Sequence, residues 1–400
     1  MKKIAIVVQR YGNEIVGGSE SLTMQYTQKL KNNYNIDIIT TTCFDNTTWD
    51  NYYPEGEVII DDIKVIRFKT TQLRIVNDNV SLIHNKILKR VGINEPTELK
   101  DDKYWIDTQG PYCPDLLNYI SEHQHNYDAF VFMTYLYYPF VYGLPLAAYK
   151  SVIIPTAHDE PWIKLNIFKY LFSIPRYICF LTEEEKNIVH NIFKNNYIEH
   201  NITGTGIEVP EAINTNNFKD KFKINDKYII YLGRIEESKG VGELIKYFIK
   251  YKKIYNSEIK LVLIGTGSYK VPERNDIFSV GYLDESLKYE AISGAEFLTA
   301  SSRYESLCIA LLEAFALKVP ALVNGECEVL KSHIIKSKSG LYYTNKNEFI
   351  EATHKLITSK DRNKKMRENA YEYVNKNYTW KKVINNLCEA IEYVSSYKNN

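Results

Sequence analysis

Two glutamates lie eight residues apart in the segment YESLCIALLEA, residues 304–314. Glu305 and Glu313 flank an almost wholly apolar run, where acidic side chains rarely occur without a partner. Eight residues slightly exceed two helical turns, so both carboxylates can face one cleft. Because a carboxylate accepts hydrogen bonds from vicinal hydroxyls, the pair could hold a ribose and a sugar ring. A helix-terminal Glu and a second, partly exposed Glu would be the purely structural interpretation.

Two cations precede these glutamates in the chain. Arg234 ends the predicted strand YIIYLGR, and Lys239 lies in the loop ESKG just before a predicted helix. Ligands of open α/β sheets bind at the carboxyl ends of strands, and a helix N-terminus favours anions, so this pair suits a diphosphate. Ordinary solvated surface cations are the alternative.

The segment GTG, residues 265–267, follows the predicted strand KLVLI. A glycine such as Gly265 lets the backbone approach a ligand closely, although any tight strand-to-helix turn uses the same residue. No G-x-x-x-x-G-K-[ST] occurs, which excludes a P-loop nucleotidase.

The first half of the chain reads as a strand, loop, helix and strand. IAIVV (4–8) is a β-branched apolar run, Leu22, Tyr26 and Leu30 recur at helical spacing, and IDIITTTCF (36–44) is the next apolar run. This unit begins a doubly wound sheet. Further strands are predicted at 65–68, 129–133, 151–156 and 177–182.

The same pattern restarts at residue 228, with a helix predicted over 241–255 and strands over 260–264, 295–301 and 319–325. We therefore expect an α/β fold with two Rossmann-like domains facing a central cleft. The predicted boundaries are an N-terminal domain over 1–209, a polar linker over 210–227, a C-terminal domain over 228–377 and a final amphipathic helix over 378–400.

Composition narrows the class further. The chain has 400 residues, enough for two domains, and a net charge of +1, which does not favour nucleic acid. Six scattered cysteines form no C-x-x-C, so free thiols in a reducing cytoplasm are expected. No signal peptide and no apolar run of the ~20 residues that a membrane helix needs is recognisable. These features predict a soluble, cytoplasmic protein.

Together the motifs resemble a known family. YLGRIEESKG, LVLIGTG, VGYLDE and YESLCIALLEAFALKVPALVNG, all within 228–342, are similar in order and spacing to the glycosyl transferase group 1 family, retaining enzymes of the family 4 type with the GT-B architecture. In the first half, GGSE (17–20), PTAHDEP (155–161) and GTGIEVP (204–210) resemble this family's glycine loop, His-Asp segment and domain end. The resemblance covers nearly the whole chain.

The resemblance assigns roles on the donor side, in the C-terminal domain. Arg234 and Lys239 would bind the donor's diphosphate and stabilise it as a leaving group. Glu313 would hold the nucleotide ribose, and Glu305 would contact hydroxyls of the transferred sugar. The base and the phosphates would be framed by Gly265, Gly281, Tyr282, Leu307, Cys308 and Ile309.

The resemblance also assigns roles in the N-terminal, acceptor-side domain. His158 would lie beside the donor sugar across the cleft, with Asp159 orienting its imidazole or simply beginning a turn. Gly17 and Gly18 would let the first loop approach the phosphates. The final helix would cross back onto this domain.

One position departs from the family. Phe-Gly usually follows the first Glu and Ser, whereas this chain has Leu307 and Cys308. The cysteine adds a Cβ, which backbone amide donation survives but which changes the surroundings of the donor sugar.

The resemblance implies a retaining glycosyltransferase. It would move a hexose from a UDP- or GDP-sugar to a hydroxyl of a glycan, glycolipid or lipid-linked acceptor in cell-surface polysaccharide or glycoconjugate synthesis. No D-x-D occurs, and two side-chain cations can hold the diphosphate, so no metal and no cofactor beyond the nucleotide sugar is expected. A lipid-linked acceptor would add a weak peripheral contact with a membrane.

Three other functions fit parts of the pattern. One is a nucleotide-sugar epimerase or hydrolase on the same fold, and another is an inactive sugar-nucleotide-binding subunit. A third is a nicotinamide-dependent dehydrogenase, which the first loop disfavours because it lacks G-x-G-x-x-G.

Overall fold

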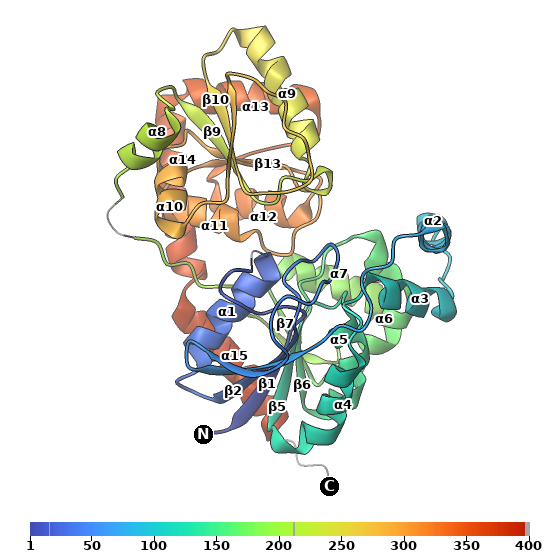
Figure 1. The fold of residues 1–400 in the computed structure, drawn as a ribbon. Coiled ribbons are helices and arrows are strands. Elements are labelled where there is room, and N and C mark those ends of the chain that lie inside the picture. The colour runs from blue at the N-terminus through green and yellow to red at the C-terminus, as the bar shows by residue number, and fades with distance from the viewer. Residues whose placement is uncertain (16, 211–212, 397–400) are drawn as a thin grey trace. The chain divides into compact units, whose positions relative to one another are not determined.

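The computed structural model describes residues 1–15, 17–210 and 213–396. The chain divides into two compact units, one formed by Met1–Gly204 with Trp380–Asn400 and the other by Thr205–Thr379. Each unit is a sheet with helices packed against it (Figure 1). The predicted class, α/β with two Rossmann-like domains, is confirmed.

The first unit contains, within the described residues, an eight-stranded sheet in the order β3-β4-β2-β1-β5-β6-β7-β8. β3 pairs antiparallel with β4, and the other neighbours pair in parallel. The strands are β1 (Lys3–Val7), β2 (Asn35–Thr41), β3 (Gly56–Ile60), β4 (Ile63–Phe68), β5 (Ala129–Met133), β6 (Ser151–Ile154), β7 (Tyr177–Phe180) and β8 (Glu199–Ile202). The helices are α1 (Gly18–Leu30), α2 (Asp78–Gly92), α3 (Leu99–Gln109), α4 (Pro114–His123), α5 (Tyr138–Gly143), α6 (Asn166–Leu171), α7 (Glu183–Phe193) and α15 (Trp380–Ser395).

The central strands of this sheet are buried on both faces. All five residues of β5 are buried, as expected of a strand covered by helices on each side. One face carries Ala5, Val7 and Phe132 into a core shared with α3 to α6. The other face carries Ile6 and Val131 toward α1 and α15.

The second unit contains a parallel sheet in the order β11-β10-β9-β12-β13-β14. Its strands are β9 (Tyr228–Leu232), β10 (Lys260–Ile264), β11 (Ile277–Gly281), β12 (Leu298–Ala300), β13 (Ala321–Asn324) and β14 (Gly340–Tyr343). Its helices are α8 (Asn216–Phe222), α9 (Val241–Tyr255), α10 (Glu285–Ser293), α11 (Ile309–Ala316), α12 (Glu328–Ser337), α13 (Lys346–Thr358) and α14 (Lys360–Asn377), with the short 3-10 turn η5 (Glu237–Lys239) before α9. Because every strand runs the same way, the loops that follow them gather at one edge.

The predicted linker over 210–227 is largely part of the second unit. Residues 211–212 lie outside the described residues, but α8 is a helix whose Phe218 is fully buried. Glu290 of α10 accepts hydrogen bonds from the Asn217 amide and the Phe218 N–H, each 3.0 Å long. The sequence did not predict this helix because its composition is mostly polar. One buried aromatic ring and one carboxylate are enough to hold it against the second unit. The first unit ends at Gly204, whereas the sequence placed the boundary at residue 209.

The final helix, α15, belongs to the first unit although it follows the second in sequence. Its buried residues include Leu387 and Ile391, and it packs against β6, β7 and β8. The Asn201 side chain donates to the Asn386 carbonyl, and the Asn386 side chain donates back to Ile202, at 2.9 and 2.8 Å. Of the predicted range 378–400, residues 397–400 lie outside the described residues.

No helix in the described ranges combines the length and apolar character that crossing a membrane requires. All six cysteines are free thiols.

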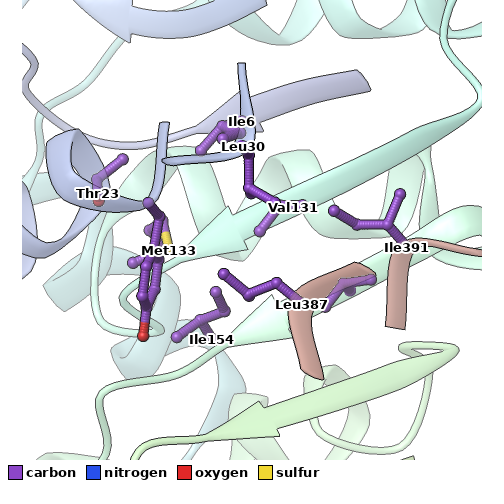
Figure 2. A pocket seen from close by; sticks show the side chains of 10 residues that line it. Ile6, Thr23, Leu30, Val131, Met133, Ile154, Leu387 and Ile391 are labelled. Atoms are coloured by element: carbon purple, nitrogen blue, oxygen red, sulfur yellow. The ribbon is translucent and has the colours of Figure 1, made fainter. Parts of the chain in front are cut away.

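A small apolar cavity lies where α1 and α15 cover the sheet (Figure 2). Its walls come from Ile6, Val131 and Ile154 of neighbouring strands and from Leu387 and Ile391 of α15. These side chains converge from both layers without closing the space between them. Lost packing contacts of this kind reduce stability.

The cavity predicts that Val131→Ile stabilises the protein. The added methyl group fills empty space, so the free energy of unfolding should rise by about 0.5–1 kcal/mol. Val7→Ile is the matched control, because Val7 lies on the opposite face in the closely packed core and should lose stability through overpacking. Denaturant unfolding measures both, and a destabilised Val131→Ile variant would contradict the assignment of the cavity.

Candidate functional site

The loops that follow β9 and β10 pack backbone against backbone at the carboxyl edge of the second sheet. The Ile235 N–H donates to the Thr266 carbonyl at 2.9 Å. Gly265 has φ +131°, and a Cβ there would lie 2.0 Å from the Gly233 carbonyl oxygen. Close packing between these two loops therefore requires a glycine at position 265.

The two predicted diphosphate cations each pair with a carboxylate. Arg234, 46% exposed at its side chain, lies 2.9 Å from Glu236. Lys239, 25% exposed, lies 2.8 Å from Glu305. In this arrangement Lys239 and Glu305, both predicted as site residues, are in direct contact.

The backbone holds Lys239 in place. Lys239 ends η5, and Gly240 follows with φ +73°. A Cβ on Gly240 would lie 2.4 Å from the Ser301 carbonyl oxygen, while the Ser301 hydroxyl donates to the Lys239 carbonyl at 2.8 Å. Burial lowers the pKa of Lys239, but the charge and hydrogen bond of Glu305 outweigh this effect, and the net pKa is raised. Lys239 is thus a fixed cation.

Cys308 immediately precedes α11 and has φ +66°. This left-handed conformation is the one that glycine adopts without strain, so Cys308 occupies a backbone geometry that suits glycine despite its added Cβ. Leu307, just before it, is buried. The first N–H groups of α11, beginning at Ile309, have no acceptor within the helix and so form an anion-attracting terminus. Burial raises the pKa of the Cys308 thiol, which disfavours a nucleophilic thiolate.

Glu313 lies further along α11 and pairs with a lysine that sequence reasoning missed. Its carboxylate is 2.7 Å from Lys288 of α10, with side chains 10% and 17% exposed. Burial raises the pKa of Glu313, and Lys288 acts in the opposite direction. The segment DESLKYE contains no signal that a lysine meets Glu313, because the contact depends on how two successive helices pack against each other.

The end of β11 supplies the remaining predicted donor residues. Gly281 has φ +75°, and its carbonyl accepts the Gly265 N–H at 2.9 Å. Tyr282, next in the chain, is 62% exposed. The loops after β9, β10 and β11 are therefore joined by successive backbone hydrogen bonds.

His333 of α12 supports the same edge and was also missed. Its Nε2 lies 3.0 Å from the Leu307 carbonyl oxygen, and its Nδ1 lies 3.1 Å from the Tyr373 hydroxyl. A carbonyl only accepts, so Nε2 carries the proton. His333 thereby fixes Leu307, the residue immediately before Cys308.

In the first unit, Gly17 caps α1 and Gly18 begins it. A Cβ on Gly17 would lie 2.3 Å from Glu20, whereas one on Gly18 would meet nothing within 4 Å. Glu20 is buried and accepts hydrogen bonds from Gln9 and from Arg10 Nε, both at 3.0 Å. The glycine loop is thus positioned by an internal ion pair.

His158 follows β6, and the carboxylate beside its ring differs from the one considered from sequence. Nδ1 of His158 is 3.3 Å from Glu160. Asp159 instead turns outward, 61% exposed at its side chain and 3.1 Å from Lys164. Adjacent residues of this loop point in opposite directions, so Glu160 faces the His158 ring and Asp159 faces solvent.

Glu185 of α7 anchors the loop that carries His158. It is fully buried and accepts the N–H groups of Ala157 and Leu181 at 2.5 and 2.6 Å. Burial raises the pKa of Glu185 to about 8, although both N–H groups act against this. The segment LTEEE contained a capping-box signal for this residue: the Thr182 hydroxyl accepts the Glu185 N–H at 3.1 Å.

Cys308→Gly should be more stable than Cys308→Ala. Both variants remove the thiol, but only glycine relieves the left-handed strain, so the difference should be about 0.5–1 kcal/mol in favour of glycine. Ala310→Gly inside α11 is the control and should cost about 1 kcal/mol. Chemical denaturation provides the comparison, and an alanine variant as stable as the glycine variant would disprove the strain.

Glu185 should make stability depend on pH. Its folded pKa, about 8, exceeds the unfolded value of 4.5, so its stabilisation is complete below 4.5 and is lost as the pH rises through 8. Between pH 5 and 8 the free energy of unfolding should fall, relative to Glu185→Gln, by at least about 1 kcal/mol. Parallel slopes for the two proteins would contradict this.

A family model matches most of the second unit. Residues 213–373 match the family model of glycosyl transferases group 1. An uncharacterized glycosyltransferase of Methanocaldococcus jannaschii is 24% identical over 265 residues, which cover 59% of this chain and 66% of that protein.

Solved structures share the fold of the whole chain. Sucrose-phosphate synthase from Thermosynechococcus elongatus superposes with a TM-score of 0.70 at 13% identity, covering 99% of this chain and 100% of that one. The Anabaena protein HepE, in complex with UDP and glucose, gives a TM-score of 0.69 at 10% identity, covering 98% and 100%. Residues 213–373 are therefore similar to the glycosyl transferases group 1 family, and the whole chain shares the GT-B fold of these solved structures.

Proposed function

We propose that this protein is an anomer-retaining, metal-independent transferase. It moves a hexose from a UDP- or GDP-sugar to a hydroxyl of a glycan, glycolipid or lipid-linked acceptor in cell-surface polysaccharide or glycoconjugate synthesis. The observation that carries the proposal is the contact of Lys239 with Glu305 beside the N-terminus of α11. HepE is similar in fold and binds UDP with glucose, which makes UDP the first nucleotide to test.

The ion pairs Lys239–Glu305 and Lys288–Glu313 suit a nucleotide sugar because they contain both cations and carboxylates. A diphosphate attracts Lys239 and Arg234, and hydroxyl groups attract the carboxylates. When a diphosphate binds Lys239, Glu305 becomes available to hydroxyls of the sugar. The Glu313 carboxylate, held by Lys288, is the proposed acceptor for the ribose hydroxyls.

The proposed reaction needs positioning and charge stabilisation. The bond between the sugar C1 and the β-phosphate oxygen breaks, and its electron pair leaves with the nucleoside diphosphate. Lys239 and Arg234 stabilise the growing negative charge. The acceptor hydroxyl attacks C1 from the face that the phosphate leaves, and its proton passes to that phosphate. No protein nucleophile is assigned.

The first unit contributes His158, which Glu160 orients and the anchor at Glu185 positions. We propose that its imidazole contacts the donor sugar. The free thiols fit a reducing compartment, and we propose the cytoplasm as the place of action.

Calorimetric titration with UDP, GDP, ADP and NAD in the presence of EDTA tests the proposal. UDP or GDP should bind, and the double variant Arg234→Ala/Lys239→Ala should weaken binding at least 100-fold, because two charge-assisted contacts of about 1.5–3 kcal/mol each are lost. Lys227→Ala is the matched control, since Lys227 precedes β9 at the opposite edge of the sheet.

Each other outcome points elsewhere. Binding that EDTA abolishes would reject metal independence. Binding of NAD alone, or of no nucleotide, would reject the transferase. Incubation of donor with and without acceptor sugars separates transfer from hydrolysis or epimerisation, which change the donor without an acceptor.

A further inference from the structure

Three arginines gather at the carboxyl edge of the first sheet, around two aromatic rings. The Arg10 and Arg74 guanidinium carbons lie 5.9 and 5.5 Å from the centre of the Trp49 ring. The Arg67 guanidinium carbon lies 3.9 Å from the centre of the Tyr53 ring. These residues come from β4 and from the loops after β1, β2 and β4, whose order in the sheet brings them together.

Carboxylates lie near this cluster as well: Glu14 acts on Tyr53, and Asp50 acts on the neighbouring Cys43. Arg10 is neutralised by Glu20. Neither Arg67 nor Arg74 forms an ion pair with a carboxylate in the described part of the chain, although Tyr137 and Asp45 act on Arg74 and Tyr53 acts on Arg67. The Arg74 Nε donates to the Gln109 carbonyl at 3.3 Å. Burial lowers the pKa of both arginines, which shows that their charges are costly where they lie.

Arg67 is 5% exposed, and its Nε has no hydrogen-bond partner. Its Nη2 donates to the Tyr11 carbonyl at 3.0 Å. Three other buried polar atoms at this edge lack a partner: Gln9 Oε1, the Tyr53 hydroxyl and the Thr134 hydroxyl. Native proteins rarely leave such groups unsatisfied, so several in one place require a partner such as ordered water or a bound ligand.

Aromatic rings border the cluster. Phe44 and Tyr52 are 38% and 64% exposed, with ring centres 5.1 Å apart, and Tyr53 lies 5.0 Å from Tyr52. Exposed rings beside buried cations suit a ligand with one apolar face and one anionic group. A sugar ring that carries an oxyanion has this character.

We propose that the acceptor is an anionic sugar, whose phosphate or carboxylate binds Arg67 and Arg74 while its ring packs on Tyr52 and Tyr53. This inference rests on the proposed transferase function and adds the chemical class of its acceptor. Arginine's planar fork binds either oxyanion through two parallel hydrogen bonds. Arg10 stays tied to Glu20 and keeps the Trp49 ring in place.

The test measures sugar binding to the full chain with UDP at saturation, so that the diphosphate site is filled. Glucose 6-phosphate, glucuronate and glucose are titrated by calorimetry on the wild-type protein and on two variants. Arg74→Gln removes a half-buried charge and leaves the strands intact, whereas Arg67→Lys keeps the charge and removes the fork. Arg90→Gln on α2 is the matched control in the same unit.

The proposal expects glucose 6-phosphate or glucuronate to bind at least tenfold more tightly than glucose. Arg74→Gln and Arg67→Lys should each remove that preference, and Arg90→Gln should retain it. The stronger of the two anionic sugars identifies phosphate or carboxylate as the group recognised.

Two results would overturn the inference. One is that glucose and both anionic sugars bind equally or do not bind at all, and the other is that Arg74→Gln keeps the wild-type preference for anionic sugars. UDP titration alone separates this failure from failure of the transferase. If UDP binds and the anionic preference is missing, the acceptor class is wrong and the transferase stands. If neither UDP nor GDP binds, the transferase function and the acceptor class are both rejected.

Discussion

Two largely buried carboxylates, each neutralised by a lysine, join the main elements of the second unit. Glu305 and Glu313 lie largely out of water, and each is compensated by a lysine from another element. Because an uncompensated buried charge costs several kcal/mol, these pairs join the loop after β12 to the loop after β9, and α11 to α10. β9 and β12 are neighbours in the sheet, so strand order makes the first contact achievable. The charged groups proposed to contact a nucleotide sugar therefore also stabilise the packing of these elements.

Close backbone packing sets the second constraint. Gly240 and Gly265 lie so near neighbouring carbonyl groups that no side chain fits. Cys308 shows the converse case, in which a residue with a side chain adopts the left-handed conformation that suits glycine. The surrounding packing, including the contact of His333 with Leu307, fixes the turn and carries its strain.

The first unit uses buried carboxylates in the same way, but for backbone and guanidinium groups. Glu185 binds two N–H groups below the His158 loop, and Glu20 binds Arg10 beside the glycine loop. Each carboxylate fixes a loop that would otherwise depend on weak surface contacts. Arg67 lacks such a partner, and this difference is what sets its surroundings apart as a place for an anion.

The sequence alone determined the fold class, the main parallel strands and the motif residues, because long apolar runs and glycine loops are local signals. It missed β3, β8, β11 and β14, which are short or partly exposed and so carry no clear apolar run. The helix α8 looked like a linker for the same reason. Tertiary structure alone decided which polar groups meet: Lys288 with Glu313, Glu160 with His158, and His333 with the Leu307 carbonyl. The first and third contacts depend on how separate elements pack together, and the second depends on the path of an irregular loop. Residue spacing encodes neither.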